Sequence, residues 1–276
     1  MVNRQQVRAA VPTRPIGLVQ AFDIQPGEVI SLVGAGGKTT LMFALAGELA
    51  SGGGVIATTT TTKIFEWQAA GTHLIIESDD EKMIAMLLEQ IKEHRQVTLA
   101  KERLPGEGKL SGISPELVAK LAKLEQVSCI IIEADGAARK PLKAPNATEP
   151  VIAPNTSLVI PVVGFDALGS KLTEEEVFRP EIISRLTGLS MGDTISADAI
   201  ATLITHPDGI TKGSPPDARI IPVINKVDLA GDLSEAEELA NRILEKGHPR
   251  IERVVLGQIQ LPEPIAKIVP AIAAGA

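Results

Sequence analysis

From Val29 to Thr40 the chain reads VISLVGAGGKTT, and a helical run from Leu41 to Ala50 follows. The order is a strand-forming segment, a glycine-rich turn and a helix. Backbone N–H groups in such a turn, together with those at the helix N-terminus, point inward and form an anion site. The stretch therefore predicts a phosphate-binding loop. The alternative is a tight strand–helix turn that binds no ligand. Such a turn would not require the run Gly-Gly-Lys-Thr-Thr.

The predicted loop gives its polar residues distinct roles. Lys38 is expected to reach the β- and γ-phosphates of a nucleotide, and the Thr39 hydroxyl is expected to bind Mg²⁺. The strict pattern G-x-x-x-x-G-K-[ST] requires glycine at position 32, where the chain has leucine, so the loop is a shorter G-x-G-G-K-T-T form. The dinucleotide-binding fingerprint does not fit, because Thr39 stands where its last glycine belongs. The expected nucleotide-binding residues of the loop are Gly34, Ala35, Gly36, Gly37, Lys38, Thr39 and Thr40.

Short runs rich in β-branched residues alternate with helical patterns along the chain, which is typical of a mostly parallel α/β sheet. We therefore expect an α/β fold with a mostly parallel sheet sandwiched by helices, the three-layer architecture of P-loop NTPases. Residues 1–21 are predicted to form an N-terminal lead-in, and residues 22–276 a single nucleotide-binding domain whose second half is elaborated at about 140–215. The predicted strands are Val29–Val33, Val55–Thr59, His73–Glu77, Val97–Ala100, Ser128–Glu133, Leu158–Val163, Arg219–Ile224 and Arg253–Leu256.

Local chemistry marks several helix starts. Ser114-Pro115 places proline in the first helical turn, where its missing N–H costs nothing. Capping-box spacing, in which side chains bond the free N–H groups of the first turn, occurs at Ser78/Glu81, Thr173/Glu176 and Ser234/Glu237. Each of these positions predicts the beginning of a helix.

An apolar run from Ser128 to Ile132, typical of a central strand buried on both faces, ends in Glu133 and Asp135. Because these carboxylates are two residues apart, they are expected to project from the same face. In a P-loop protein, Asp135 holds Mg²⁺ through water, and Glu133 is a ligand or orients the attacking water. The alternative is a pair of solvated acids at a strand end. We predict Lys38, Glu133 and Asp135 as the catalytic residues.

Threonine occupies every position from 58 to 62, at the end of the second predicted strand. Ligands of open α/β sheets bind at the carboxyl ends of the strands, so Thr60 or Thr61 is expected to contact Mg²⁺ or a phosphate. The alternative is the ordinary preference of β-branched residues for strands. The predicted metal-binding residues are Thr39, Asp135 and Thr60.

A late strand is followed by Asn225-Lys226-Val227-Asp228, which resembles the guanine-recognition motif N-K-x-D of GTPases. In that motif the aspartate accepts two N–H groups of the guanine edge, the lysine stem lies along the base, and the asparagine ties the loop to the phosphate loop. Adenine offers no matching donors. Asn225, Lys226 and Asp228 are therefore predicted to bind the nucleotide and to favour GTP.

The composition excludes several function classes. With 27 lysines and arginines against 34 aspartates and glutamates, the formal net charge is −7, which argues against a general nucleic-acid or membrane-surface binder. A single cysteine excludes a disulfide framework and a thiolate zinc cluster held by this chain alone. No apolar run approaches the ~20 residues of a membrane-spanning helix. We expect a cytoplasmic protein.

Taken in order, the motifs G-A-G-G-K-T-T, T-T-T-T-K, E-A-D-G-A, R-K-P-L-K-A-P, V-V-G-F-D-A-L-G, R-P-E, H-P-D-G and N-K-V-D resemble those of the YqeC family. The resemblance spans residues 16 to 260. It implies a bacterial cytoplasmic accessory factor for selenium-dependent molybdenum hydroxylases. Its partner would then be a molybdenum hydroxylase apoprotein or an enzyme that matures the cofactor.

Several basic residues within these motifs are candidates for contact with an anionic substrate. Arg139, Lys140 and Lys143 follow the Asp135-Gly136 turn, and the alternative for them is a solvated basic loop. Each of the remaining candidates, Arg179, His206 and Lys212, also has a structural alternative, as an ion-pair partner, a turn residue or a surface cation.

These observations support three functional hypotheses. The first is a Mg²⁺-dependent protein that binds and hydrolyses GTP, or ATP, during maturation of a metalloenzyme or its cofactor. The second is a kinase or a Mur-like ligase that activates a small acid. The third is a scaffold that delivers a cofactor under nucleotide control and turns over little by itself.

Overall fold

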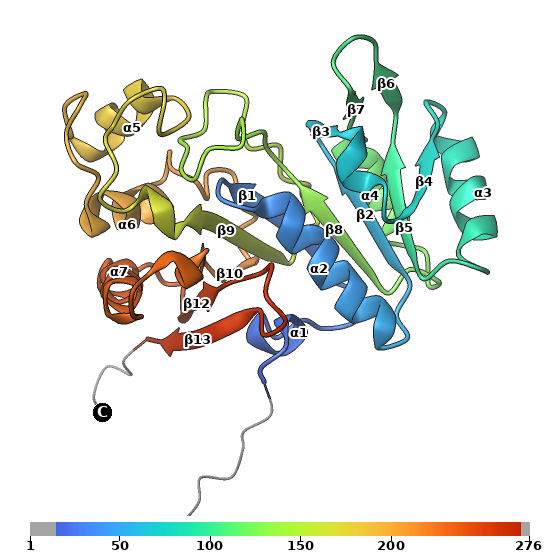
Figure 1. Ribbon diagram of the computed structural model, residues 1–276. Coiled ribbons are helices and arrows are strands. Elements are labelled where there is room, and N and C mark those ends of the chain that lie inside the picture. Colours follow the sequence, from blue (N-terminus) through green and yellow to red (C-terminus); the bar gives the residue numbers. More distant parts are fainter. Residues whose placement is uncertain (1–14, 272–276) are drawn as a thin grey trace, which may run out of the picture.

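The computed structural model describes residues 15–271, so residues 1–14 of the predicted lead-in lie outside the described residues. A ten-stranded sheet crosses the molecule (Figure 1). In spatial order its strands are β13 (Ile265–Pro270), β12 (Arg253–Gly257), β11 (Val223–Asn225), β9 (Leu158–Gly164), β1 (Val29–Gly34), β8 (Cys129–Glu133), β2 (Ile56–Thr60), β5 (Gln96–Ala100) and β4 (His73–Ile76), and β10 (Arg219–Ile220) pairs with β9. Every pair in this sheet is parallel except β12 with β13.

Helices cover both faces of the sheet, which gives the three-layer α/β architecture expected from the sequence (Figure 1). On β1, Ile30 and Leu32 pack in one apolar cluster, while Val29 and Val33 pack in clusters on the opposite face. The first face is covered by α1 (Leu18–Ala21) and α2 (Lys38–Ser51). The second is covered by α3 (Asp80–Gln90), α4 (Pro115–Leu121), α5 (Pro180–Thr187), α6 (Ala197–Thr205) and α7 (Ser234–Glu245).

The last residues of the predicted lead-in pack against the main body. Leu18 and Ala21 are buried in the cluster that also contains α2. The backbone N–H groups of Leu18 and Val19 donate to the Glu48 carboxylate at 2.8 and 3.0 Å. The carboxylate thus supplies acceptors for N–H groups at the start of α1, which have no partner within the helix.

A small second sheet, in the order β3-β7-β6, was not expected from the sequence. Its strands are β3 (Lys63–Phe65), β7 (Lys109–Ser111) and β6 (Glu102–Leu104), and the short helix η1 (Glu66–Ala69) follows β3. Runs of three residues carry too little periodicity to be recognised as strands. Because β3 follows β2 and β6 follows β5, this sheet rises from the carboxyl ends of the main strands, beside the start of α2 (Figure 1).

Some predicted boundaries were wrong in detail. The expected strand 219–224 is two short strands, because Pro222 between them has no N–H to donate. No helix begins after Thr173, where only a turn forms, and α3 is capped by Asp79, whose side chain accepts the N–H of Lys82, rather than by Ser78. The predicted cap Ser234 is itself the first residue of α7. Ser114 caps α4 as predicted. Among the described residues, no helix has both the length and the apolar character needed to cross a bilayer.

The small sheet is docked by a close backbone approach at Gly112, and this predicts a stability effect. A Cβ at position 112 would lie 2.1 Å from the Thr60 carbonyl oxygen. We expect Gly112→Ala to lower the free energy of unfolding by about 1–3 kcal/mol, because backbone must move to admit the methyl group. Chemical denaturation measures the change. Gly71→Ala is the control, since a Cβ there meets no atom within 4 Å; equal effects of the two variants would contradict this reading.

Candidate functional site

The glycine loop, residues 34–40, joins the buried strand β1 to the long helix α2. Gly34, Gly36 and Gly37 have φ values of 91°, 84° and 123°, a region that glycine adopts readily and other residues rarely. A Cβ on Gly36 would lie 2.1 Å from the backbone nitrogen of Gly164. The glycines therefore let the loop turn sharply while it touches the end of β9.

Internal partners occupy the first N–H groups of the loop. The N–H of Gly34 donates to Asp135 Oδ2 at 3.1 Å, and those of Ala35 and Gly36 donate to backbone carbonyls at 2.8 and 3.1 Å. Gly34 and Ala35, both predicted to contact the nucleotide, are buried. Gly34 and Ala35 therefore shape the loop and do not line the cavity.

The N–H groups of residues 37–40 donate to no protein acceptor within residues 15–271. They stand at the N-terminus of α2, where a helix leaves its first N–H groups without an intrahelical acceptor and carries a partial positive charge. Gly37, Lys38, Thr39 and Thr40 also line a cavity of about 860 Å³, which is described below. This part of the loop can accept a negatively charged group.

Lys38 is buried, and its ammonium group is enclosed by oxygen atoms. Lys38 Nζ donates to the Gly34 carbonyl at 2.6 Å and lies 3.1 Å from Asp135 Oδ1 and 3.8 Å from Glu133 Oε1. Burial by itself lowers the pKa of Lys38, but the carboxylates of Asp135 and Glu133 outweigh burial and hold that pKa above its usual value. The side chain is therefore a fixed positive charge within the loop.

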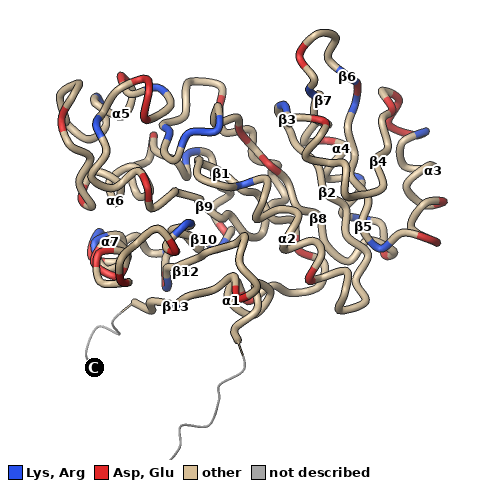
Figure 2. The backbone as a smooth tube through the Cα atoms, in the orientation of Figure 1, with Lys and Arg blue, Asp and Glu red and all other residues tan. Residues whose placement is uncertain are grey.

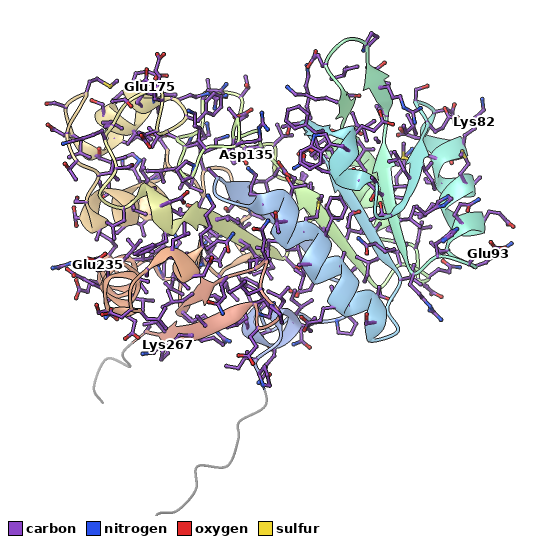
Figure 3. All side chains as sticks on the ribbon, in the orientation of Figure 1. Lys82, Glu93, Asp135, Glu175, Glu235 and Lys267 are labelled. Atoms are coloured by element: carbon purple, nitrogen blue, oxygen red, sulfur yellow. The ribbon has the colours of Figure 1, made fainter. Side chains whose placement is uncertain are left out.

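Glu133 and Asp135 lie close together as predicted, but their partners differ from those expected. The Thr39 hydroxyl donates to Glu133 Oε2 at 2.5 Å, so Glu133 is the acid beside the predicted metal ligand. Burial raises the pKa of Glu133, against the opposing effect of Lys38 and Thr39. Asp135, labelled in Figure 3 above the first turn of α2, instead faces Lys38, Lys143 and the N–H of Gly34.

The oxygen atoms of Thr39 and Glu133 form a pair suited to Mg²⁺, which takes one or two protein ligands and completes its shell with water and phosphate oxygens. The described residues hold no group of three or more His, Cys, Asp or Glu side chains arranged around a metal site. Thr60, the other predicted metal ligand, is buried, and its hydroxyl donates to the Glu133 carbonyl at 2.7 Å and accepts the N–H of Thr62 at 3.0 Å. The Thr60 hydroxyl is therefore hydrogen-bonded to backbone groups.

A chain of alternating charges connects the glycine loop to the elaborated second half of the protein. Lys143 is completely buried, and its Nζ lies 3.0 Å from Asp135 Oδ2 and 2.9 Å from Glu149 Oε2. Arg179 Nη1 lies 2.7 Å from the same Glu149 oxygen. Burial raises the pKa of Glu149, but its bonds to Arg179 and Lys143 outweigh burial and leave the pKa below its usual value. Lys143 thus lies beneath the cavity instead of facing a ligand.

The Asn225–Asp228 segment approaches the glycine loop as the sequence motif suggests. Asn225 Nδ2 donates to the Gly36 carbonyl at 2.9 Å, which ties the segment to the loop. Lys226 has a φ of 66°, lines the cavity and pairs with Asp166 at 2.7 Å. Asp228 lies in the short helix η3 (Val227–Leu229), exposed and outside the cavity lining.

A cavity of about 860 Å³ opens over the glycine loop, at the carboxyl ends of the strands. Its size lies within the range of small-molecule sites. Its lining is basic, and Figure 2 shows lysine and arginine on the loop beyond β8 and on the small sheet. The lining cations are Lys38, Lys63, Lys109, Arg139, Lys140, Arg179 and Lys226, against the acids Glu133 and Glu149.

Backbone strain gathers around this cavity. Within the described residues, the non-glycine positions with positive φ are Asp23, Ala138, Arg139, Arg179 and Lys226, and all except Asp23 line the cavity. Such conformations cost free energy and persist where the surrounding structure enforces them, most often at functional sites. The strain supports the choice of this cavity as the functional site.

The other residues predicted to bind substrate either lie outside the cavity or are hydrogen-bonded to the protein. Lys140 lines the cavity, but its ammonium donates to the Glu175 carbonyl. Lys212 donates to the Asn146 carbonyl, and His206 Nδ1 accepts the N–H of Asp208 at 3.0 Å at the end of α6. Neither Lys212 nor His206 lines the cavity, so the structure does not bring them to the glycine loop.

The sequence did not reveal several lining residues. Lys63, Phe65 and Lys109 come from the small sheet, and Glu149 and Phe178 from the elaborated half. Of these, Lys63 alone belongs to a quoted motif, T-T-T-T-K; the others lie in short strands or loops whose positions depend on long-range packing. The run Thr62-Lys63 was the available signal, since it continues the threonine run toward the cavity.

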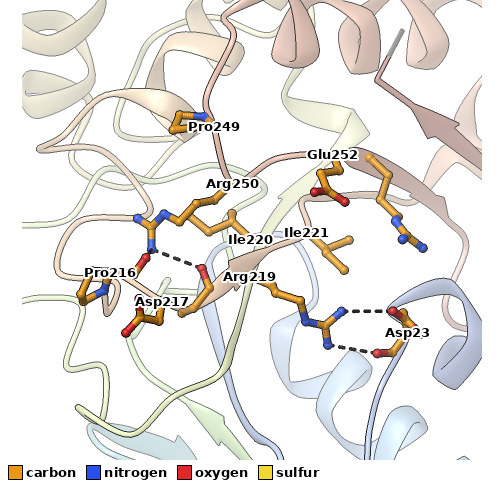
Figure 4. A pocket seen from close by; sticks show the side chains of 11 residues that line it. Asp23, Pro216, Asp217, Arg219, Ile220, Ile221, Pro249, Arg250 and Glu252 are labelled. Atoms are coloured by element: carbon orange, nitrogen blue, oxygen red, sulfur yellow. Dashed lines mark hydrogen bonds and ion pairs between the residues drawn. The ribbon is translucent and has the colours of Figure 1, made fainter. Parts of the chain in front are cut away.

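A smaller cavity of about 270 Å³ lies at the opposite edge of the sheet, where β10 and β12 begin (Figure 4). Arg219 pairs there with Asp23 and Glu28, and Arg250 donates to backbone carbonyls that include that of Ala218. Both guanidinium groups therefore already have hydrogen-bond partners within the protein. Ligands of α/β sheets bind at the carboxyl ends of the strands, which favours the cavity at the glycine loop as the candidate functional site.

The fold and the site together define a three-layer α/β protein with a glycine loop, a buried lysine and strand-end acids beneath a basic cavity. The family model described as "YqeC protein" matches residues 30–181. A relative from Escherichia coli (strain K12), whose name reads "Uncharacterized protein YqeC", is 33% identical over 244 residues, which are 87% of this chain and 90% of the relative. The chain belongs to the YqeC family, as the motifs of the sequence predicted.

The position of Glu149 predicts a pH-dependent contribution to stability. Because its pKa is lowered in the folded state, its charge stabilises the fold above the unfolded pKa, and this stabilisation is lost as pH falls through the lowered pKa. We expect Glu149→Gln to reduce the free energy of unfolding at pH 7 by about 1–3 kcal/mol, because it leaves Lys143 with a weaker set of partners. The difference in the free energy of unfolding between this variant and the unmodified protein should become smaller at pH values below the usual pKa of glutamate.

Thermal unfolding between pH 7.5 and pH 3.5 measures this difference. Glu174→Gln, an exposed position in the same half of the chain, serves as the control and should change little at any pH. A destabilisation by Glu149→Gln that is the same at every pH would show that the ion pairs do not carry the effect.

Proposed function

We propose that this protein binds a Mg²⁺–nucleoside triphosphate at the glycine loop and hydrolyses it, with GTP preferred to ATP. The observation that carries the proposal is the set of N–H groups of residues 37–40, which have no protein acceptor among the described residues and stand beside Lys38. N–H groups at a helix N-terminus, with an adjacent lysine, bind phosphate oxygens and stabilise the charge that develops during phosphoryl transfer.

In this proposal the chain's own residues divide the work. Lys38 neutralises charge on the β- and γ-phosphates, and Thr39 with Glu133 holds Mg²⁺. The metal would supply further positive charge to the same phosphate oxygens. Asp135 is a positioning residue, because its contacts to Lys38 and to the N–H of Gly34 fix the loop from below. This assignment keeps Glu133 as a metal ligand, one of the two roles that the sequence suggested for it, and replaces the metal-binding role suggested for Asp135.

The preference for GTP rests on the Asn225–Asp228 segment. The bond from Asn225 to the Gly36 carbonyl places the segment beside the glycine loop, as in the N-K-x-D arrangement. Asp228 takes part in no hydrogen bond or ion pair among residues 15–271, so its carboxylate is available to the guanine edge. A carboxylate that accepts the guanine N–H groups has no such donors to meet on adenine.

The proposed biological role rests on family membership alone. We propose that nucleotide binding serves the maturation of selenium-dependent molybdenum hydroxylases or of their cofactor in the bacterial cytoplasm. The partner would be the hydroxylase apoprotein or an enzyme of cofactor maturation. Membership of the YqeC family is what supports this role.

Calorimetric titration with Mg²⁺–GTP and Mg²⁺–ATP tests the nucleotide proposal. We expect GTP to bind at least ~10-fold more tightly than ATP, a difference of about 1.4 kcal/mol. Lys38→Ala should weaken both nucleotides, because it removes the charge beside the phosphates. Asp228→Asn should abolish only the difference between them, whereas the matched control Asp217→Asn, at the opposite edge of the sheet, should leave it unchanged. Tighter binding of ATP would remove the GTP assignment.

The metal assignment predicts a separate effect of Glu133. Removing Mg²⁺ with a chelator should weaken GTP binding to the unmodified protein by at least ~10-fold, about 1.4 kcal/mol. In Glu133→Gln this dependence on Mg²⁺ should largely disappear, because the neutral amide binds Mg²⁺ more weakly than the carboxylate that it replaces. The measurement is GTP affinity with and without Mg²⁺ for both proteins. An undiminished Mg²⁺ dependence in Glu133→Gln would return the metal to Asp135.

A further inference from the structure

One end of the large cavity is built by residues that the proposed nucleotide site does not use. Lys63, Phe65 and Lys109 come from the small sheet, Gln68 comes from the short helix η1, and Arg139 comes from the loop after β8. We call this set the Phe65 subsite. It lies beside the glycine loop within the same cavity.

Contacts with an aromatic ring organise the cations of the Phe65 subsite. Lys109 Nζ lies 5.1 Å from the centroid of the Phe65 ring, and Arg139 Cζ lies 5.6 Å from it. A cation near an aromatic face within about 6 Å is held by the ring quadrupole. Arg139 has a φ of 60°, so the chain adopts a strained conformation at this residue. The Phe65 ring therefore brings together charges from two separate parts of the fold.

The charge of the subsite is not balanced within the cavity. Arg139 forms no ion pair among the described residues, and none of the five subsite residues is acidic. Lys63 and Lys109 lie 3.3 and 3.7 Å from Glu107, which is outside the cavity lining. One exposed carboxylate thus faces both lysines, and the cavity keeps an excess of positive charge that suits an anion.

The order of the strands places this subsite away from the proposed base-binding segment. Asn225–Asp228 begins at the last residue of β11, which lies on one side of β1, beyond β9. The small sheet follows β2 and β5, which lie on the other side of β1, beyond β8. A nucleotide whose base lies toward Asp228 and whose phosphates lie on the glycine loop therefore directs its terminal phosphate toward β8 and the Phe65 subsite.

We propose that the Phe65 subsite binds a second ligand together with the nucleotide, a small molecule that carries phosphate or carboxylate groups. This inference rests on the proposed nucleotide function, because it takes the glycine loop as the site of the triphosphate. Lys109 and Arg139 bind the anionic groups, and Lys63 and Gln68 complete the wall. The ligand then lies next to the terminal phosphate of the nucleotide, in the place of a co-substrate.

Anion titration of the nucleotide-loaded protein tests the proposal. The full chain is saturated with a non-hydrolysable GTP analogue in excess Mg²⁺, so that the glycine loop is occupied, and is then titrated by calorimetry with pyrophosphate or with citrate. We expect one equivalent of anion to bind. If pyrophosphate binds more tightly than citrate, the natural ligand carries phosphate groups. If citrate binds more tightly than pyrophosphate, the natural ligand carries carboxylate groups.

Matched variants locate the bound anion. The double variant Lys109→Gln/Arg139→Gln should weaken the anion at least ~10-fold and leave the affinity for the analogue within about threefold. Arg103→Gln, on β6 of the same small sheet and paired with Glu66 outside the cavity, should leave anion binding unchanged. Unchanged binding of the analogue also shows that the double variant is folded.

Three results would overturn the subsite: no anion binding to the loaded protein, equal binding by the double variant, or binding only when the analogue is absent. Failure of the analogue to bind the unmodified protein would instead overturn the proposed nucleotide function. In that case, weaker anion binding by the double variant than by Arg103→Gln would still place an anion at Phe65. The two proposals can therefore fail separately.

Discussion

The buried carboxylate of Asp135 holds the site together. It accepts the N–H of Gly34, where β1 ends, and it pairs with Lys38 at the start of α2 and with Lys143 from the loop beyond β8. A buried charge is tolerated only when it is paired and hydrogen-bonded. Asp135 meets that condition by fixing the strand end, the first turn of the helix and the following loop in one arrangement.

Further ion pairs connect this arrangement to the second half of the chain. Through Lys143 and Glu149 the same set of charges continues to Arg179, which lies at the cavity wall and is the N-cap residue of α5. Ion pairs of this kind contribute less to stability than hydrophobic contacts of similar volume, and their value lies in fixing positions. We therefore regard the elaborated half as part of the site, since it supplies one wall of the cavity and holds the acid beneath the loop.

The sequence motifs identified which residues lie together in the site. They identified less well which of these residues form hydrogen bonds and ion pairs with one another. The N-K-V-D motif led to the prediction that Asn225 ties its loop to the glycine loop, and the bond to the Gly36 carbonyl confirms that contact. The same reasoning placed Asp135 beside the metal, whereas Thr39 bonds to Glu133. Spacing along a strand tells which side chains share a face, but the partner of each side chain depends on a neighbouring strand and helix, whose offset the sequence does not state.

Three features could be predicted from the amino-acid sequence without the structure: the strand–turn–helix unit at 29–50, the parallel strands of the sheet and the family to which the chain belongs. These features are local: they depend on glycine at left-handed positions, on β-branched runs and on motif order. Only the folded structure shows which N–H groups of the loop lack an acceptor within residues 15–271, that Lys143 is buried, and that Lys109 and Arg139 meet at Phe65. Those features join residues far apart in the chain, so they are set by the packing of the two sheets and the loops between them rather than by any local preference.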